Sequence, residues 1–290
     1  MSIASFTTLL SATELRALLD AHAHAQAHAP AVIVDCSFDL ADAQLGERSW
    51  RAGHVPGSHY LHLDAHLSGA KTGRNGRHPL PVRAAFAGTL GRLGVTPQTQ
   101  LVALDRQGGV YAARLWWMLR WMGHSAVAVL DGGMAAWTQA GGTLATSDTP
   151  PRVAPPYPER APLTPVLSAD RLAAQLGAVR LLDARAAERF RGDVEPLDAA
   201  AGHIPGALNR FFKDNLEADG RFKPASQLHD EFAVVMGGQP ASSVVHQCGS
   251  GVTACHNLLA MEHAGLTGSA LYPGSWSEWS SDPERPVARG

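Results

Sequence analysis

The sequence predicts an α/β protein made of two tandem domains, each a parallel sheet flanked by helices, joined by a proline-rich linker. Two observations lead to this prediction. A five-residue turn occurs twice, as Gly53-His54-Val55-Pro56-Gly57 and as Gly202-His203-Ile204-Pro205-Gly206. In both halves, stretches with strand character also alternate with stretches of helical spacing. With 290 residues, the chain is long enough for two hydrophobic cores of ordinary size.

The predicted strands lie at matching places around these turns. An apolar run that ends in aspartate precedes each turn, at residues 32–35 and 179–183. A second run with strand character follows each turn, apolar at residues 101–104 and with two valines bounded by polar residues at 243–247. Short runs rich in valine and leucine are typical of strands buried in a parallel sheet. We therefore expect these runs to form the middle of each sheet.

Helices are expected after the second strand of each half. Apolar residues with helical spacing predict one helix over 112–122 and another over 252–264. The spacing of Trp116 and Trp117 in the first of these favours core packing over a pocket lining. Both halves then close on a stretch that contains glycine and tryptophan, at 130–137 and 271–279.

A cluster of prolines separates the two halves. Such a density of proline excludes a helix or a central strand and suits an extended connector. We therefore predict a first domain over 1–147, a linker over 148–165 and a second domain over 166–290. The prolines are Pro150, Pro151, Pro155, Pro156, Pro158, Pro162 and Pro165.

Composition limits the classes of function. A net charge of −2 and 17% charged residues give no reason to expect nucleic acid or an acidic membrane as a partner. No apolar run approaches the roughly 20 residues of a membrane span, and the N-terminal residues lack a secretion signal. The three cysteines are too few for a disulfide framework. These features predict a cytoplasmic protein.

Cys248 is the predicted nucleophile. It follows the strand over 243–247 and begins the loop Cys248-Gly249-Ser250-Gly251-Val252-Thr253, which leads into a helix. Glycine permits backbone angles that turn successive N–H groups toward one point, and the N-terminus of a helix favours negative charge. We expect this loop to lower the thiol pKa, and the backbone of Gly249, Gly251, Val252 and Thr253 to hold the substrate.

The equivalent position in the first half carries no thiol. Asp105 follows the strand over 101–104, and the sequence after it, Arg106-Gln107-Gly108-Gly109, does not repeat the cysteine loop. Only the second half is therefore predicted to be catalytic. Cys255 lies about two helical turns after Cys248, where we expect a buried structural thiol rather than a redox partner.

The doubled plan, the two turns, the cysteine loop and Gly274-Ser275-Trp276-Ser277-Glu278-Trp279 together resemble the rhodanese superfamily. The resemblance is closest to its members that use 3-mercaptopyruvate, and it implies two rhodanese-like domains. It also implies that the Cys248 thiolate takes sulfur from a donor, becomes a persulfide and passes the sulfur to cyanide or to a thiol such as thioredoxin. The resemblance implies no metal and no organic cofactor.

The same resemblance assigns roles to individual residues. It implies a proton relay of Ser250, His78 and Asp64, which lie in matching local patterns. It also implies that Arg189 binds the donor carboxylate, and a planar guanidinium suits that anion.

Two positions depart from the family pattern. Leu197 stands where relatives commonly have a second arginine, and Pro273 stands where they usually have aspartate. Leu197 cannot bind a carboxylate, so another cation such as Arg191 or Arg106 would have to replace the missing arginine.

Three alternative functions follow from the same residues. Thiosulfate could be the main donor, although the loop offers this dianion no Lys or Arg next to Cys248. A cysteine-dependent phosphatase would need an arginine six positions after the cysteine, where this chain has Ala254. A non-catalytic persulfide-sensing or scaffolding module is the remaining alternative.

Overall fold

The computed structural model describes residues 5–24, 31–150 and 154–290. The chain divides into two compact units. The first consists of Met1–Leu67, Pro81–Leu163 and Ala218–Arg221, and the second of Ser68–Leu80, Thr164–Glu217 and Phe222–Gly290. Each unit thus contains one short segment from the other half of the sequence.

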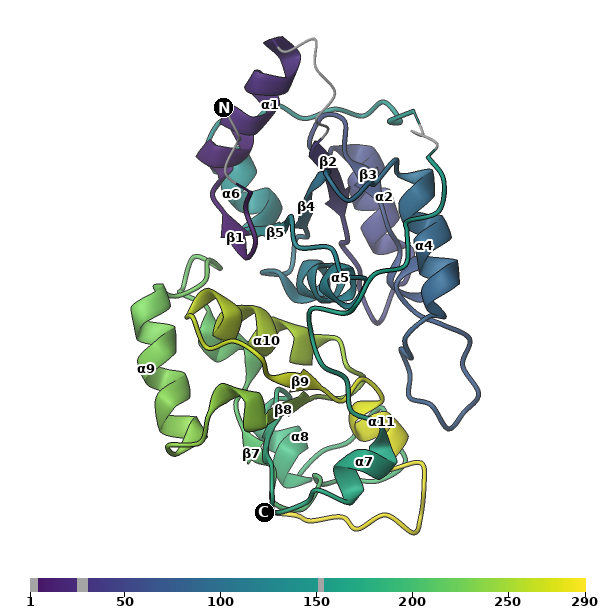
Figure 1. Ribbon diagram of the computed structural model, residues 1–290, viewed down its shortest axis with the longest axis vertical. Coiled ribbons are helices and arrows are strands. Elements are labelled where there is room, and N and C mark those ends of the chain that lie inside the picture. Colours follow the sequence, from purple (N-terminus) through teal and green to yellow (C-terminus); the bar gives the residue numbers. More distant parts are fainter. Residues whose placement is uncertain (1–4, 25–30, 151–153) are drawn as a thin grey trace. The chain divides into compact units, whose positions relative to one another are not determined.

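The first unit is a five-stranded parallel sheet flanked by helices (Figure 1). Its strand order is β1-β5-β4-β2-β3, so β4 lies in the middle. The elements are β1 Leu9–Leu10, α1 Ala12–His24, β2 Ala31–Asp35, α2 Leu45–Ala52, β3 His59–Tyr60, α3 Leu63–His66, α4 Arg83–Arg92, β4 Gln100–Leu104, α5 Val110–Trp121, β5 Val127–Leu130 and α6 Gly133–Gln139.

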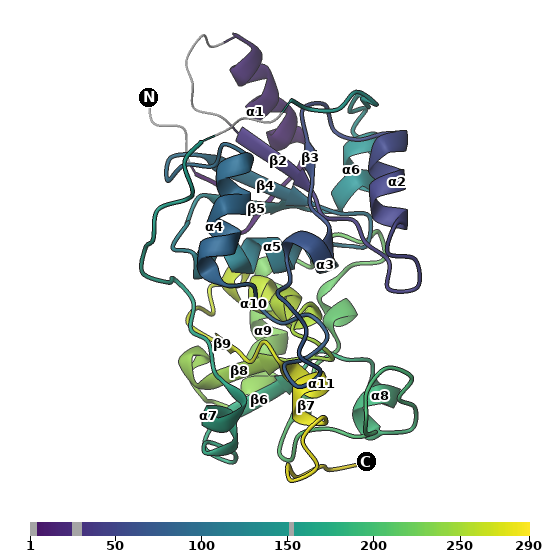
Figure 2. The same ribbon diagram turned by 90° about the vertical axis from the view of Figure 1, so that its right-hand side faces the viewer.

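The second unit is a four-stranded parallel sheet with the order β7-β6-β8-β9. Helices α9 and α10 lie side by side in Figure 1 and in Figure 2. The elements are α7 Ala169–Ala173, β6 Arg180–Asp183, α8 Ala187–Arg191, β7 Leu208–Asn209, η1 Phe212–Asn215, α9 Ala225–Met236, η2 Ala241–Ser243, β8 Val244–Gln247, α10 Thr253–His263, β9 Ala270–Leu271 and α11 Ser275–Trp279.

The two sheets have matching register, which confirms the predicted fold class. In the first unit Asp35 of β2 pairs with Leu104 of β4, and in the second Asp183 of β6 pairs with Gln247 of β8. The four predicted strands agree with β2, β6, β4 and β8 to within one residue at either end. Both predicted helices agree with α5 and α10 to within two residues.

The repeated turns have the same structural role in both units. His54 stacks on Trp50 and contacts its carbonyl oxygen at 2.8 Å, and His203 does the same with Phe190 at 2.8 Å. Each histidine also forms an antiparallel bridge to a later segment, at Ala145 and Ala288 respectively. These histidines therefore fix the turn.

Each unit has its own apolar core, formed where the helices cover the sheet. Trp116 and Trp117 of α5 are 1% and 0% exposed, as their spacing predicted. In the second unit Trp276 and Trp279 of α11 are both 0% exposed and pack with Leu181, Val245 and Tyr272.

The predicted linker over 148–165 contains residues 151–153, which lie outside the described residues. The part from residue 154 to 163 has no regular structure and packs on the first unit. The N–H of Ala154 donates to Gly91 O, that of Tyr157 to Ala87 O and that of Leu163 to Arg120 O. Within the described ranges, none of the helices has the length and apolar character to cross a membrane.

Candidate active site

Cys248 stands where the central strand β8 of the second unit ends. The residue is 2% exposed, and its Sγ accepts a hydrogen bond of 3.1 Å from the N–H of Gly251. An N–H donor stabilises negative charge on sulfur. The loop then passes through Val252 into α10, whose first residue is Thr253. The predicted strand, loop and helix around the thiol are therefore present.

The loop conformation at position 251 requires glycine. The φ of Gly251 is +78°, in the left-handed region that favours glycine. A Cβ at this position would lie 2.2 Å from Pro273 O, which is far inside van der Waals contact. Pro273, the second departure from the family pattern, thus contributes a backbone carbonyl that packs directly against the loop.

Helix α11 holds the cysteine loop through hydrogen bonds made by its backbone and by one serine side chain. Ser275 Oγ accepts a hydrogen bond of 3.1 Å from Cys248 N, and the N–H of Trp276 donates to Cys248 O at 2.9 Å. The N–H of Ser277 donates to Gly249 O at 2.9 Å. Ser275 has a φ of +53°, which costs a non-glycine residue about 1–2 kcal/mol. The sequence argument missed this supporting role of Ser275.

The segment Ser68–Leu80 brings His78 to the loop within the second unit. His78 Nδ1 lies 2.7 Å from Ser250 Oγ, and both side chains are buried, at 5% and 7% exposed. Ser277 Oγ accepts a hydrogen bond of 3.0 Å from Arg77 N, which holds the segment against α11. Two members of the predicted relay are therefore in direct contact.

Two guanidinium groups lie over Gly249, beside the cysteine. A Cβ at Gly249 would lie 2.9 Å from Arg77 Nη2 and 3.4 Å from Arg189 Nη1. Neither of these nitrogens has an acceptor among the described residues of the second unit. The sequence offered no cation within the loop, but the fold supplies two from other segments. Arg77 was missed, although it directly precedes His78 and that adjacency was a usable signal.

Two carboxylates hold these guanidinium groups in place. Arg189 Nη2 donates to Glu195 Oε1 at 2.6 Å and to Asp198 Oδ2 at 3.1 Å, and Arg77 Nη1 donates to Asp198 Oδ1. Both carboxylate side chains are only 3% exposed. Burial raises the pKa of Asp198, and the hydrogen bond from Arg77 opposes that effect. Asp198 therefore bridges both guanidinium groups.

Leu197 and Arg191 lie beside this cluster at the surface. The N–H of Leu197 donates to Glu195 Oε1 at 3.1 Å, while its side chain is 46% exposed. The guanidinium of Arg191 is 48% exposed and pairs with Asp193 at 2.7 Å. The two cations next to Gly249 are therefore Arg77 and Arg189, and Arg191 is not one of them.

The equivalent strand end of the first unit is built around Asp105. One carboxylate oxygen accepts from the N–H groups of Gln107 and Gly109, and the other accepts from those of Tyr111 and Ala112, at 2.8–3.0 Å. The side chain is 1% exposed, and burial raises its pKa against the effect of these four donors. A fixed carboxylate thus occupies the place of the thiol.

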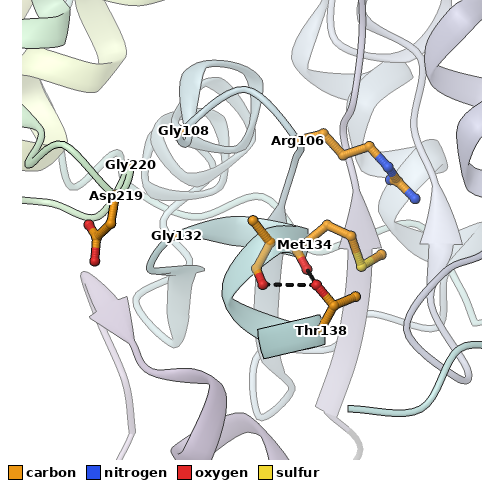
Figure 3. Close-up of a pocket in the computed structure, with 8 residues that line it drawn as sticks. Arg106, Gly108, Gly132, Met134, Thr138, Asp219 and Gly220 are labelled. Atoms are coloured by element: carbon orange, nitrogen blue, oxygen red, sulfur yellow. Dashed lines mark hydrogen bonds between the residues drawn. The ribbon is translucent and has the colours of Figure 1, made fainter. Parts of the chain in front are cut away.

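A pocket of ≈ 350 Å³ lies next to this loop in the first unit (Figure 3). The Arg106 guanidinium points away from Asp219 in the figure and donates to Asp35 Oδ2 at 2.7 Å and to Gly53 O at 2.6 Å. These bonds give Arg106 a structural role. The pocket is lined by Arg106, Gly108, Gly132, Met134, Ala135, Thr138, Asp219 and Gly220.

Asp64 lies in the first unit, as the second residue of α3, where its N–H donates to His62 Nδ1 at 3.1 Å. Its place in the relay stays a prediction from the sequence.

Cys255 is 0% exposed, and its thiol donates to Gly251 O at 3.3 Å, so it packs as the expected buried thiol. Among the described residues, no group of three or more His, Cys, Asp or Glu side chains could hold a metal ion.

Comparison with known proteins gives a consistent family. The model of the rhodanese-like domain matches the chain twice, over residues 11–140 and 168–282. The protein named "Probable 3-mercaptopyruvate sulfurtransferase" of Pseudomonas aeruginosa is 46% identical over 263 residues, which cover 89% of this chain and 92% of that protein. The thiosulfate sulfurtransferase of Gallus gallus is 31% identical over 257 residues, or 85% of each chain.

A solved structure agrees with the sequence relatives. The 3-mercaptopyruvate sulfurtransferase from Leishmania major superimposes with a TM-score of 0.82 at 30% sequence identity. The match covers 94% of this chain and 74% of that one.

Proposed function

The chain belongs to the family of rhodanese-like sulfurtransferases, and we propose that it transfers sulfur from 3-mercaptopyruvate to an acceptor through a persulfide on Cys248. The observation that carries this proposal is the buried Cys248 thiol, with an N–H at its sulfur and with His78, from the segment Ser68–Leu80, in contact with Ser250 of the cysteine loop. Such a constellation suits a nucleophile that must stay ionised while a proton moves nearby.

The first step forms an S–S bond and breaks a C–S bond. The Cys248 thiolate attacks the donor's sulfur, and the electron pair of the C–S bond leaves with the carbon fragment. The thiol proton of the donor ends on that carbon, so pyruvate and a Cys248 persulfide are formed. There is no net change of charge and no external oxidant or reductant.

His78 and Ser250 are the groups that move this proton. Their contact of 2.7 Å allows the serine hydroxyl and the imidazole to exchange a proton without rearrangement. We assign Asp64 to orient the histidine, as the third member of the relay. The backbone of Gly249, Gly251, Val252 and Thr253 would then hold the reacting sulfur atoms.

Arg189 binds the donor carboxylate in this proposal. Arg77 is the second cation and replaces the arginine that relatives commonly have at the position of Leu197. Both guanidinium groups face Gly249, one residue from the nucleophile. Planar N–H pairs fit a carboxylate better than an ammonium does. Arg191 and Arg106 already have carboxylate partners in the structure, Asp193 and Asp35.

In the second step the persulfide gives its outer sulfur to an acceptor, which restores the Cys248 thiolate. With cyanide the product is thiocyanate, and with a thiol it is a persulfide of that thiol. We propose a small dithiol protein of the thioredoxin type as the physiological acceptor. The three cysteines are all free thiols, which suits the reducing cytoplasm as the place of action.

Thiosulfate remains the second candidate donor. Several relatives, among them the protein of Gallus gallus, are named for that activity, and the two guanidinium groups could bind a sulfonate as well as a carboxylate. Sulfite, rather than pyruvate, would then leave after attack on the outer sulfur.

The test is sulfur loading measured by intact mass. The protein should gain the mass of one sulfur atom after treatment with 3-mercaptopyruvate and lose it after cyanide, whereas Cys248→Ser should gain nothing. Arg189→Ala should raise the KM for 3-mercaptopyruvate about tenfold or more, since it removes a charged hydrogen-bond donor. Arg171→Ala, an exposed arginine of α7, is the matched control and should leave the KM unchanged. Full activity in Cys248→Ser would refute the mechanism.

A further inference from the structure

We propose that Asp198 selects the donor by its charge: it neutralises the Arg77–Arg189 pair so that the site takes a monoanionic sulfur donor and disfavours a dianionic one. The inference rests on the proposed function and concerns the same loop. The Asp198 carboxylate accepts from both arginines, so it acts through them as a positioning residue.

The charges around Gly249 cancel. Three guanidinium groups, of Arg77, Arg189 and Arg185, are matched by three carboxylates, which are those of Asp198, Glu195 and Asp183. The side chains of Asp198 and Glu195 are both 3% exposed, so solvent screens them little. An incoming anion therefore meets oriented N–H groups but no excess positive charge.

Asp198 has the position from which a single charge acts on both cations. Each of its carboxylate oxygens accepts from a different arginine, Oδ1 from Arg77 and Oδ2 from Arg189. Glu195 contacts Arg189 and Arg185 and also holds the N–H groups of Leu197 and Asp198, so it shapes the turn. Replacing Glu195 would disturb the backbone, whereas replacing Asp198 would chiefly change the charge.

The exposed Leu197 strengthens this inference. A third cation in this turn would leave an excess positive charge over Gly249, but Leu197 contributes only its backbone N–H to the cluster. The charge of the two arginines is therefore balanced by Asp198 and Glu195 alone in this turn.

Asp198→Asn tests the inference because it removes the charge and keeps an oxygen that can accept from an arginine. The measurement is kcat/KM for thiosulfate and for 3-mercaptopyruvate, with cyanide as acceptor. One added positive charge favours a dianion more than a monoanion, so the thiosulfate to 3-mercaptopyruvate ratio should rise about tenfold. The increase should shrink as salt is added.

Asp193→Asn is the matched control, since Asp193 lies in the same segment but is 54% exposed and its one ion pair within the described part of the chain is with the surface residue Arg191. Its donor ratio should equal that of the intact protein. An equal ratio in both variants would overturn the inference while leaving the proposed function intact. The proposed function is tested separately, because it fails if 3-mercaptopyruvate does not load sulfur on Cys248 of the intact protein.

If Asp198→Asn does not fold, the salt dependence of kcat/KM for thiosulfate in the intact protein tests the inference instead. A neutral site predicts that kcat/KM for thiosulfate changes by less than about twofold between low and physiological salt. A steep fall, about tenfold, would show an uncompensated positive site and would overturn the inference.

Discussion

The two units place different groups at the equivalent point of their two sheets. Where β4 ends in the first unit, the Asp105 carboxylate accepts four backbone N–H groups. Where β8 ends in the second unit, Cys248 Sγ accepts from the N–H of Gly251. The comparison teaches that in both units this loop turns backbone N–H groups toward the residue at the strand end, which is a carboxylate in the first unit and a thiol in the second.

The helices that follow the two loops are also fixed differently. The buried side of α5 is largely apolar, with Trp116 and Trp117 in the core. The buried side of α10 includes Asn257, which donates to Arg210 O and accepts from Asn215 Nδ2 at 2.7 Å. Hydrogen bonds are directional, so this network fixes the rotation of the helix that follows the Cys248 loop.

The largest effect is expected from Gly251→Ala, which breaks the loop of the second unit only. The Cβ would meet Pro273 O at 2.2 Å, and φ is +78°, so the N–H can no longer point at the sulfur. We expect the rate of sulfur loading on Cys248, followed by mass, to fall about 100-fold or more, as for the loss of an oriented N–H at a reacting centre.

Gly265→Ala is the control that separates the cost of a positive φ from the cost of a clash between the added Cβ and its neighbours. Gly265 has a φ of +77°, but nothing lies within 4 Å of its Cβ position. This control should lose about 1–2 kcal/mol of stability and keep its loading rate. Similar rates for the two variants would mean that the loop geometry does not matter.

The next effect concerns stability in the first unit. Asp105→Ala removes the acceptor of four buried N–H groups and should lower the free energy of unfolding by about 3–5 kcal/mol, measured with denaturant. Asp219→Ala, an exposed carboxylate of the same unit, should change it by less than about 0.5 kcal/mol. A small effect of Asp105→Ala would show that the carboxylate does not hold the loop.

The smallest effect is expected in the polar network that joins Glu231 through Arg210 to Asn257 of α10. Burial by itself would raise the pKa of Glu231, but hydrogen bonds from Lys223, Arg210 and Gln227 outweigh it and lower the pKa to about 2. The unfolded value is about 4.3. Because the folded pKa is the lower one, the stabilisation is present above about pH 4.3 and is lost as the pH falls through about 2.

Glu231→Gln should therefore cost about 1 kcal/mol at neutral pH and nothing near pH 2, measured by thermal or denaturant unfolding across that range. The exposed Glu217 offers the control, since Glu217→Gln should leave the pH dependence unchanged. A cost of Glu231→Gln that did not depend on pH would exclude the ion pairs as its source.

Local patterns were sufficient for the central strands and for α5 and α10, because buried strands and amphipathic helices repeat at short spacing. They were not sufficient for β1, β3 and β7, which have only two residues each and rely on pairing with distant strands. The segment Ser68–Leu80 belongs to the second unit although it precedes α4, and nothing in its composition predicts that.

The sequence by itself determined the doubled α/β plan and the glycines of the Cys248 loop, and it predicted Cys248 as the nucleophile, since these follow from residue type and local spacing. Tertiary structure alone decided the contact of His78 with Ser250, 172 residues apart, and the gathering of Arg77, Arg189, Glu195 and Asp198 around Gly249. The reason is physical. A hydrogen bond or an ion pair depends on distance in space, and only the packing of β8, α11 and the segment Ser68–Leu80 sets that distance.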